Sequence, residues 1–316
     1  MRRFLVLLAV AVAGCGGDDD AGTPPRVTVG LDFTPNAAHA GIYAAVRTHE
    51  DTEQGVRIRI RPPGAGSPDS LRLLATGRAD IGVLDIHDLG LAREQGADVV
   101  AVGALVQRPL AAVIARRDSG ITRPRELEGR PVGVAGLPSD DAVLRAVVEH
   151  DGGDFDEVDD TTIGFGAVAN LLAGKVDAAT AFWNAEGVVL RERGLRTREF
   201  RVDDFGAPPY PEVVLVVRRE TLEERRDDIA GAVRAIAAGT EEALADREAT
   251  VREIAAASES DEDIVRAQLE AIIPAMTPPL VLKREAVEGW ARFASEFGIL
   301  ARPPDVERAF EFDLVS

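Results

Sequence analysis

Apolar positions in this chain follow two recurring patterns. Strands are predicted where β-branched residues alternate with polar ones or form short apolar runs. The predicted strands are RVTVGLDF (26–33), RIRIRP (57–62), ADIGVLDI (79–86), AAVIARR (111–117), RPVGVAG (130–136), TTIGF (161–165) and DAATAFW (177–183).

Apolar positions three and four residues apart predict helices between these strands and through the C-terminal third. The first, SPDSLRLLATG (67–77), is capped by Ser67 or Asp69 and ended by Gly77. The others cover 140–150, 167–174, 221–245, 261–272 and 284–297, and the longest places Ile229, Val233, Ile236 and Leu244 on one face. This alternation predicts an α/β fold of βαβ units with mainly parallel sheets.

Two segments repeat one pattern of helix end, glycine turn, basic residue, aspartate and apolar strand. They are LLATGRADIGVLD (73–85) and LLAGKVDAATAFW (171–183). They indicate either the same step in two similar lobes or the ordinary composition of a helix-to-strand loop. Ligands of open α/β sheets bind beyond the carboxyl ends of strands. Two facing lobes would therefore gather 32–39, 85–87 and 183–186 around one cleft.

The N-terminus, MRRFLVLLAVAVAGC, predicts export. Two arginines precede an apolar run that is too short to span a bilayer, which is typical of a secretory signal peptide, here residues 1–14. The order Val12-Ala13-Gly14-Cys15 is typical of a lipobox and predicts lipid on Cys15; the alternative is an ordinary signal with an incidental cysteine. Residues 15–25 have the composition of a flexible tether. The expected location is the extracytoplasmic face of the membrane.

Charge narrows the choice of partner. The chain carries 54 acidic and 36 basic residues, a net charge of −18, which repels phosphate backbones and argues against nucleic acid. Cys15 is the only cysteine, so no internal disulfide is expected. No later apolar run approaches the roughly 20 residues of a transmembrane helix. The rest of the chain is expected to be held at the membrane by its lipid alone.

Five segments resemble, in this order, the solute-binding proteins of ABC importers. They are LDFTPNAAHAGIYAA (31–45), GRADIGVLD (77–85), VGALVQRPLAAVIARRDSGITRPRELEGRPVGVAG (102–136), LLAGKVDAATAFWNAEGVVLRERG (171–194) and DDFGAPPYPEVVLVV (203–217). LDFTPNAAH and FWNAE are most similar to the branch that binds aminopyrimidine precursors of thiamine, which also includes fungal thiamine pyrimidine synthases. Binders of sulfonate, taurine and nitrate form the neighbouring branch.

The resemblance implies a two-lobed, type II periplasmic-binding-protein-like fold with the ligand cleft between the lobes. Lobe 1 would comprise 26–108 and 212–316, and lobe 2 would comprise 109–211. The chain would cross between them near 106–109 and near 208–212. Such proteins close around a small molecule by hinge motion and deliver it to the transmembrane subunits of a permease, here as a monomer.

The resemblance also directs attention to residues that suit a flat aminopyrimidine ring, whose amine donates and whose ring nitrogens accept or carry a proton. The candidate polar contacts are Asp32, Asn36, His39, Asp85, Asn184 and Glu186, and the candidate aromatic walls are Phe33, Tyr43, Trp183 and Tyr210. Glu186 stands where the family places its pyrimidine-reading acid. Each has a structural alternative: Asp32 as a helix cap, His39 as a semi-buried histidine, Phe33 as core. His87 is a weaker candidate, and Trp290 is expected to pack within its helix.

Departures from the family pattern leave the ligand open. Phe33 replaces the usual tryptophan, and Ala37 and Ala38 replace polar residues. The alternative ligands are a sulfonate, taurine, nitrate or a riboflavin-like solute. Anions bind at free helix N-termini, whereas the helix near Ser139 starts with two aspartates, which disfavours an anionic ligand.

The remaining alternatives are an enzyme and a lipid-anchored structural or adhesive protein. The fungal synthases use a lysine-bound pyridoxal phosphate and a cysteine-rich loop. This chain has no lysine from 36 to 55 and no cysteine after Cys15, and Lys175 is expected to face water. No nucleophile, phosphate-loop or metal motif appears. The sequence therefore predicts binding without catalysis, with no cofactor and no metal.

Overall fold

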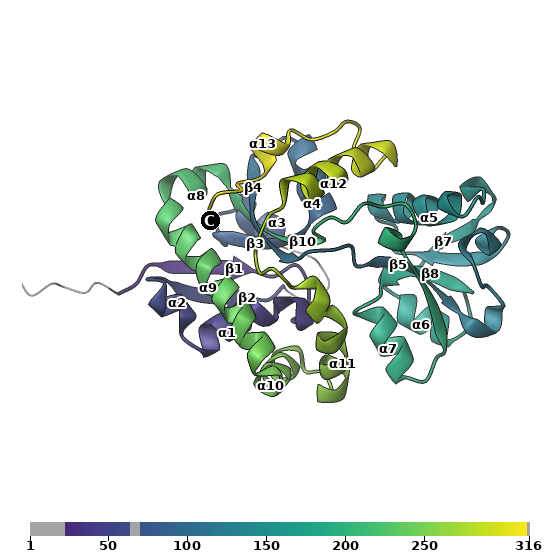
Figure 1. Ribbon diagram of the computed structural model, residues 1–316, viewed down its shortest axis with the longest axis horizontal. Coiled ribbons are helices and arrows are strands. Elements are labelled where there is room, and N and C mark those ends of the chain that lie inside the picture. The colour runs from purple at the N-terminus through teal and green to yellow at the C-terminus, as the bar shows by residue number, and fades with distance from the viewer. Residues whose placement is uncertain (1–22, 64–69, 315–316) are drawn as a thin grey trace, which may run out of the picture.

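The computed structural model describes residues 23–63 and 70–314 and contains two sheets side by side, each covered by helices (Figure 1). Cys15, the predicted signal peptide, the tether up to residue 22 and the candidate caps Ser67 and Asp69 lie outside the described residues.

The first sheet has the strand order β2-β1-β3-β10-β4. These strands are β2 (Arg57–Arg61), β1 (Arg26–Gly30), β3 (Ile81–Asp85), β10 (Val213–Arg218) and β4 (Val99–Val106). β1 is parallel to β2 and β3, whereas β10 is antiparallel to both β3 and β4. Four strands therefore point one way and β10 points the other.

The second sheet repeats this plan in the order β7-β6-β8-β5-β9. Its strands are β7 (Asp159–Thr162), β6 (Pro131–Val134), β8 (Ala178–Phe182), β5 (Ala111–Arg116) and β9 (Thr197–Arg201). Here β5 is the single reversed strand. The predicted α/β class is confirmed, but the reversed strand of each sheet was not predicted. Both reversed strands enter their sheet directly after the chain has crossed from the other one, without a βαβ crossover.

The chain passes from the first sheet to the second between Val106 and Ala111 and returns between Arg201 and Val213. Below, lobe 1 and lobe 2 denote the parts built around the first and second sheets, and the two connections are the first and second crossings. The sequence pattern missed β4, whose eight positions are all buried. A strand covered on both faces has no polar alternation to mark it.

Helices of lobe 1 surround the first sheet (Figure 1). They are η1 (Ala37–His39), α1 (Ala40–Arg47), α2 (Glu50–Glu53), α3 (Ser70–Ala75), α4 (Ile86–Glu94), α8 (Arg219–Glu224), α9 (Arg226–Ala245), α10 (Arg247–Ser258), α11 (Glu262–Ile272), α12 (Arg284–Glu296) and α13 (Val306–Ala309). The helices predicted over 261–272 and 284–297 are confirmed as α11 and α12. The one predicted over 221–245 is interrupted at Arg225, whose guanidinium binds Asp80 beside β3.

Lobe 2 carries α5 (Pro138–His150), α6 (Ala167–Leu172) and α7 (Glu186–Glu192). Gly77 after α3 and Gly174 after α6 both have φ +64°, and each turn leads into the third strand of its sheet. A side chain at such a φ is strained, which explains the glycines. The two similar segments are therefore the same helix-to-strand step in two similarly built lobes.

Helix α1, which follows the loop containing Asp32, packs closely on α9 through two glycines. A Cβ atom on Gly239 would lie 2.5 Å from the backbone nitrogen of Ala45, and one on Gly41 would collide with Thr240. Contacts this short force the helices apart.

Gly239→Ala should therefore lower the free energy of unfolding by about 1–3 kcal/mol, since it overpacks this helix contact. Chemical denaturation measures the change. Glu241→Ala, an exposed position on the same helix, is the control and should stay within about 0.5 kcal/mol of the wild type. Equal stability of the two variants would show that α1 and α9 tolerate separation.

Candidate functional site

The loop after β1 forms a compact polar unit in lobe 1. The Asn36 side chain caps η1 by accepting from the Ala38 N–H at 2.9 Å, so Asn36 and not Asp32 is the cap. The Asn36 N–H donates to His39 Nδ1 at 3.2 Å, which leaves the proton on Nε2. Nε2 then donates to Asp32 Oδ1 at 2.8 Å. A buried, neutral His39 thus holds the partly exposed Asp32 in place.

Phe33 and Phe165 place the two lobes opposite each other. Phe33 follows β1 and is 48% exposed, so it is not a core residue; Phe165 follows β7 and is 69% exposed. Their ring centroids are 6.3 Å apart. Loops at the carboxyl ends of strands from both sheets therefore face each other, where ligands of open α/β sheets bind.

Carboxylates gather at the end of β3. Asp85 caps α4 by accepting from the His87 N–H at 2.7 Å. Burial and the charge of Asp32 raise the pKa of Asp85 to about 6, although its hydrogen bonds oppose the rise. One turn later, burial and the charges of Asp85 and Asp32 raise the pKa of Asp88 to about 7. The Asp88 side chain is exposed to solvent.

Glu212, at the end of the second crossing, contacts this acidic group from below the surface. It is 1% exposed, and its Oε2 accepts from the Leu110 N–H at 2.6 Å. Burial and the Asp85 charge raise the pKa of the Glu212 carboxyl well above its ordinary range. Sequence reasoning missed Asp88 and treated Glu212 only as a lobe boundary. Asp88 lies three residues after Asp85, about one helical turn, and this spacing could have predicted that the two carboxylates lie close together.

Tyr210 is not brought to this surface, contrary to its prediction as a ligand wall. It is fully buried, and its hydroxyl lies 3.2 Å from His87 Nε2. His87 Nδ1 accepts from the Trp290 indole N–H at 3.0 Å, and burial lowers the pKa of His87 to about 3. The aromatic and aliphatic surroundings explain the difference, because a tyrosine with a satisfied hydroxyl packs well in a core. Trp290 packs within lobe 1 as predicted.

A group of candidate metal ligands lies at the same place. Asp85, His87 and Glu212 offer ligand atoms within 4.8 Å of one another. His87, however, has no free lone pair, since Nδ1 accepts from Trp290 and Nε2 carries the proton. This arrangement does not fit a metal ion.

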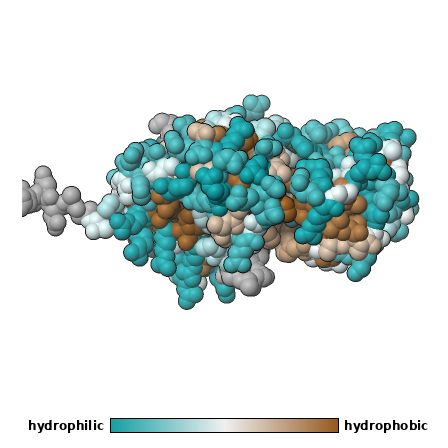
Figure 2. Space-filling model, turned by 90° about the horizontal axis from the view of Figure 1, so that it is seen from below, coloured by the Kyte–Doolittle hydropathy of each residue, from teal (hydrophilic) through white to brown (hydrophobic). Residues whose placement is uncertain are grey.

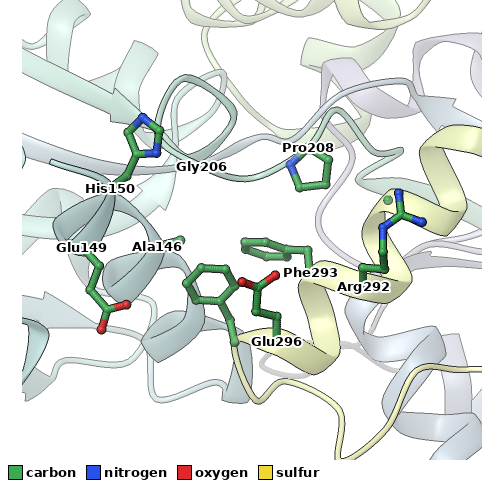
Figure 3. A pocket seen from close by; sticks show the side chains of 10 residues that line it. Ala146, Glu149, His150, Gly206, Pro208, Arg292, Phe293 and Glu296 are labelled. Atoms are coloured by element: carbon green, nitrogen blue, oxygen red, sulfur yellow. The ribbon is translucent and has the colours of Figure 1, made fainter. Parts of the chain in front are cut away.

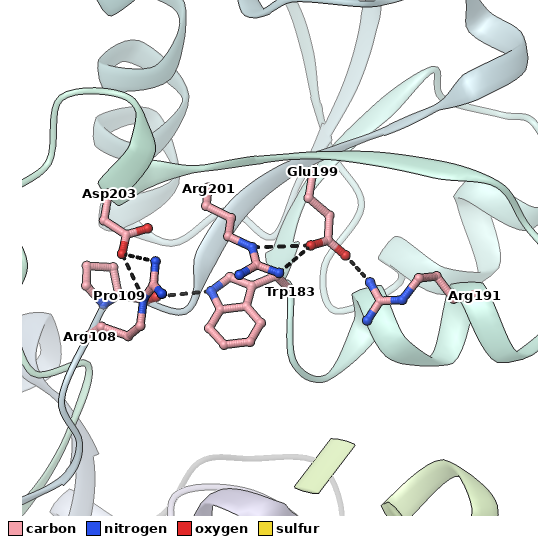
Figure 4. Close-up of polar contacts among 7 residues, drawn as sticks. All are labelled: Arg108, Pro109, Trp183, Arg191, Glu199, Arg201 and Asp203. Atoms are coloured by element: carbon pink, nitrogen blue, oxygen red, sulfur yellow. Dashed lines mark hydrogen bonds and ion pairs between the residues drawn. The ribbon is translucent and has the colours of Figure 1, made fainter. Parts of the chain in front are cut away.

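Trp183, predicted as an aromatic wall for the ligand, is 2% exposed in this structure and packs beside two arginines (Figure 4). Its indole N–H donates to the Pro109 carbonyl oxygen at 3.0 Å. The Arg201 guanidinium lies 4.1 Å from its ring, and Arg108 lies on the crossing beside it, paired with Asp203. Trp183 therefore fixes the first crossing to the end of β8.

The next residues offer polar atoms. Asn184 is 4% exposed, and its Oδ1 has no hydrogen-bond partner among the described residues. Glu186 begins α7 and accepts from the Phe182 N–H at 3.0 Å, and burial raises its pKa. Asn184 lies two residues beyond the end of β8, and Asp85 is the last residue of β3 in the other lobe. An unsatisfied buried oxygen is unfavourable unless something donates to it.

Tyr43 lies elsewhere. Burial and the nearby charge of Glu253 on α10 raise its pKa to about 12. This places the phenol beside α10, and within the described part of the chain no hydrogen bond joins it to the carboxylates at the strand ends.

The start of α5 already carries a negative charge. Asp140 Oδ2 accepts from the N–H groups of Gly136 and Leu137, both at 2.7 Å and both just before the helix, and Oδ1 accepts from the Thr180 hydroxyl at 2.9 Å. A carboxylate of the chain itself therefore lies beside the helix N-terminus, where it would repel an anion.

Other surface features lie apart from this site. A hollow of about 370 Å³ between α5 and α12 is lined by Glu149, His150, Pro208, Arg292 and Phe293, among others, and contains none of the strand-end residues (Figure 3). Apolar surface gathers on the lobe 2 end of the face in Figure 2. The exposed large apolar side chains of lobe 2 are Leu137, Phe165 and Leu172. Within the described residues, no helix combines the length and apolarity needed to cross a bilayer.

Comparison with known proteins adds the family. The chain is 31% identical over 238 residues to a formylaminopyrimidine-binding protein of Halalkalibacterium halodurans, covering 75% of this chain and 71% of that one. It is 25% identical over 233 residues to a 4-amino-5-hydroxymethyl-2-methylpyrimidine phosphate synthase of Saccharomyces cerevisiae, covering 70% and 68%.

The fold is shared with solved binding proteins. The periplasmic aliphatic sulphonate binding protein of Escherichia coli matches with a TM-score of 0.73 at 19% identity, covering 90% of this chain and 92% of that one. The two-lobed periplasmic-binding-protein-like fold implied by the sequence is thereby confirmed. The family model described as NMT1/THI5 like matches residues 36–250. This chain, with its two lobes and its carboxylates at facing strand ends, therefore belongs to the NMT1/THI5-like family.

Proposed function

We propose that this protein is the solute-binding component of an ABC importer and binds an aminopyrimidine precursor of thiamine, of the hydroxymethyl or formylamino type. The proposal rests on one observation: the strand ends that face each other carry hydrogen-bond acceptors that lack enough donors. Lobe 1 presents Asp32, Asp85 and Asp88, whose proximity raises the pKa of the latter two, and lobe 2 presents the unpaired Asn184 Oδ1. A ligand rich in N–H groups would donate hydrogen bonds to the carboxylates of lobe 1 and to the unpaired Asn184 oxygen of lobe 2.

An aminopyrimidine meets these demands. Its exocyclic amine donates to the Asp85 or Asp32 carboxylate, and Asn184 Oδ1 accepts a further N–H. Glu186 faces a ring nitrogen that carries a proton, and Phe33 with Phe165 supplies apolar ring faces from the two lobes. The name of the relative from Halalkalibacterium halodurans supports this ligand class.

A sulfonate or nitrate fits less well. The Asp140 carboxylate lies at the start of α5, and both it and the lobe 1 carboxylates repel an anion. Catalysis through lysine also lacks support, since Lys175 and Lys283 are exposed, at the end of α6 and the start of α12. We therefore infer that the protein binds its ligand as a monomer by hinge closure and delivers it to a permease. Lipid on Cys15 would attach it to the extracytoplasmic face of the cell membrane.

A thermal-shift panel on residues 23–316 separates these ligands. A ligand that binds only the folded state at 100 times its Kd adds about 2.7 kcal/mol, which raises Tm by several degrees. The panel contains 4-amino-5-hydroxymethyl-2-methylpyrimidine, its formylaminomethyl analogue, thiamine, riboflavin, taurine and nitrate. We expect a shift with the first two; a shift with taurine or nitrate alone would refute the proposed ligand.

Asn184→Ala should weaken aminopyrimidine binding roughly 5- to 150-fold, because the ligand loses its acceptor in lobe 2, a change worth about 1–3 kcal/mol. Isothermal titration calorimetry measures the affinity. Because Oδ1 forms no hydrogen bond in the ligand-free protein, the loss should appear in affinity far more than in stability. A variant that binds as tightly as the wild type would remove Asn184 from the site.

A further inference from the structure

Glu212 links both crossings to the proposed ligand site. Its carboxyl accepts from the Leu110 N–H on the first crossing at 2.6 Å, and one of its oxygens lies within 4.8 Å of an oxygen of Asp85 at the end of β3. Its own backbone donates to the Val106 oxygen at 3.1 Å and accepts from the Ile86 N–H at 2.9 Å. Glu212, itself on the second crossing, therefore contacts the first crossing through its side chain and the ends of β3 and β4 through its backbone.

Two carboxyl groups in contact at a buried place cannot both be ionised, so the pair retains one proton. Glu212 is the member that keeps it, because it is 1% exposed whereas Asp85 reaches the surface. Among the described residues, the groups that act on the pair include no cation. They are the neutral His87, the Tyr210 hydroxyl and the carboxylates of Asp32 and Asp88; Asp203, which acts on Tyr210, is paired with Arg108.

We propose that Glu212 is a positioning residue: as a neutral acid it donates to the Asp85 carboxylate and accepts from Leu110, and so holds Asp85 against the segments about which the lobes move. The role of Asp85 as a ligand contact rests on the proposed function; the shared proton does not. A ligand that binds Asp85 therefore acts, through Glu212, on the position of both crossings.

The test compares wild type with Glu212→Gln in chemical denaturation at pH 5, 6, 7 and 8. Glutamine keeps one donor and one acceptor but cannot ionise. If folded Glu212 holds a proton that the unfolded chain releases above its ordinary pKa of 4.5, the wild type loses stability relative to Glu212→Gln as pH rises. The ratio of the two unfolding constants should grow by up to tenfold per pH unit. A ratio independent of pH, or one that favours the wild type at high pH, overturns the proposal.

The same comparison in an Asp85→Asn background is the control. Without the Asp85 charge, the pKa of folded Glu212 should be lower. The ratio should therefore grow over a narrower pH range. An unchanged pH dependence in this background would show that the contact with Asp85 is not responsible.

A ligand arm uses 4-amino-5-hydroxymethyl-2-methylpyrimidine at pH 7. Glu212→Leu, which loses both hydrogen bonds, should raise Kd more than tenfold, and Glu212→Gln should recover most of that loss. Equal Kd values for Glu212→Leu and wild type would overturn the positioning role. If the wild type binds no aminopyrimidine, the proposed function fails, while the denaturation experiment still decides whether Glu212 holds the proton.

Discussion

Asp85→Asn should raise the free energy of unfolding of the ligand-free protein by about 1–3 kcal/mol at pH 7.5 and weaken aminopyrimidine binding at least about tenfold. The pKa of folded Asp85 is about 6, against an ordinary value of 3.8. Between these values the folded state holds the proton more tightly, so stability falls as pH rises and stays low above pH 6. Asparagine avoids this loss and still caps α4.

Calorimetry and chemical denaturation at pH 5 and 7.5 measure both effects. The stability gain should be larger at pH 7.5 than at pH 5, because at pH 5 the native carboxyl is mostly protonated. Asp159→Asn, on the exposed strand β7, is the matched control and should change stability by less than about 0.5 kcal/mol. A destabilised Asp85→Asn variant with wild-type affinity would make Asp85 a helix cap and nothing more.

Trp183→Ala should lower the free energy of unfolding by about 3–5 kcal/mol, as expected for removal of a buried tryptophan. The indole packs beside Arg201 and donates to the Pro109 oxygen, so its loss also frees the first crossing from β8. Trp183→Phe keeps most of the packing and loses the hydrogen bond, so it should fall between the wild type and Trp183→Ala.

Denaturation of both variants checks this order, with Phe165→Ala as the control. Phe165 is exposed, so its removal should change stability by less than about 0.5 kcal/mol. If Trp183→Ala lost less than about 1 kcal/mol while binding collapsed, the indole would be a ligand wall and not a structural anchor.

The sequence predicted much of this architecture because local signals mark it. Alternating or apolar runs identified β1, β2, β3, β5, β6 and β8, and the glycine turns at Gly77 and Gly174 identified the repeated step. Strand β10 and its reversed direction were not predicted. The direction of a strand depends on where the chain re-enters the sheet, and a local sequence pattern does not contain that information.

The candidate site shows the same division. Asp32, Phe33 and Asp85 were predicted as ligand contacts from the family resemblance and from their place at strand ends, and they stay predictions. Tyr210 and Trp183 share that neighbourhood in sequence, but both rings turn into the protein, where His87 and Pro109 satisfy their polar atoms. The raised pKa of Glu212 comes from burial and from Asp85, a residue far away in the chain, so no sequence motif predicts it.

The central claim is that facing strand ends bind an aminopyrimidine. Isothermal titration calorimetry of residues 23–316 with 4-amino-5-hydroxymethyl-2-methylpyrimidine and its formylaminomethyl analogue tests it most directly, with taurine as the comparison. The account predicts saturable binding of at least one pyrimidine at one site per chain, weakened by Asp85→Asn and Asn184→Ala and unaffected by Asp159→Asn. Binding of taurine alone, or pyrimidine binding that survives both site variants, would contradict it.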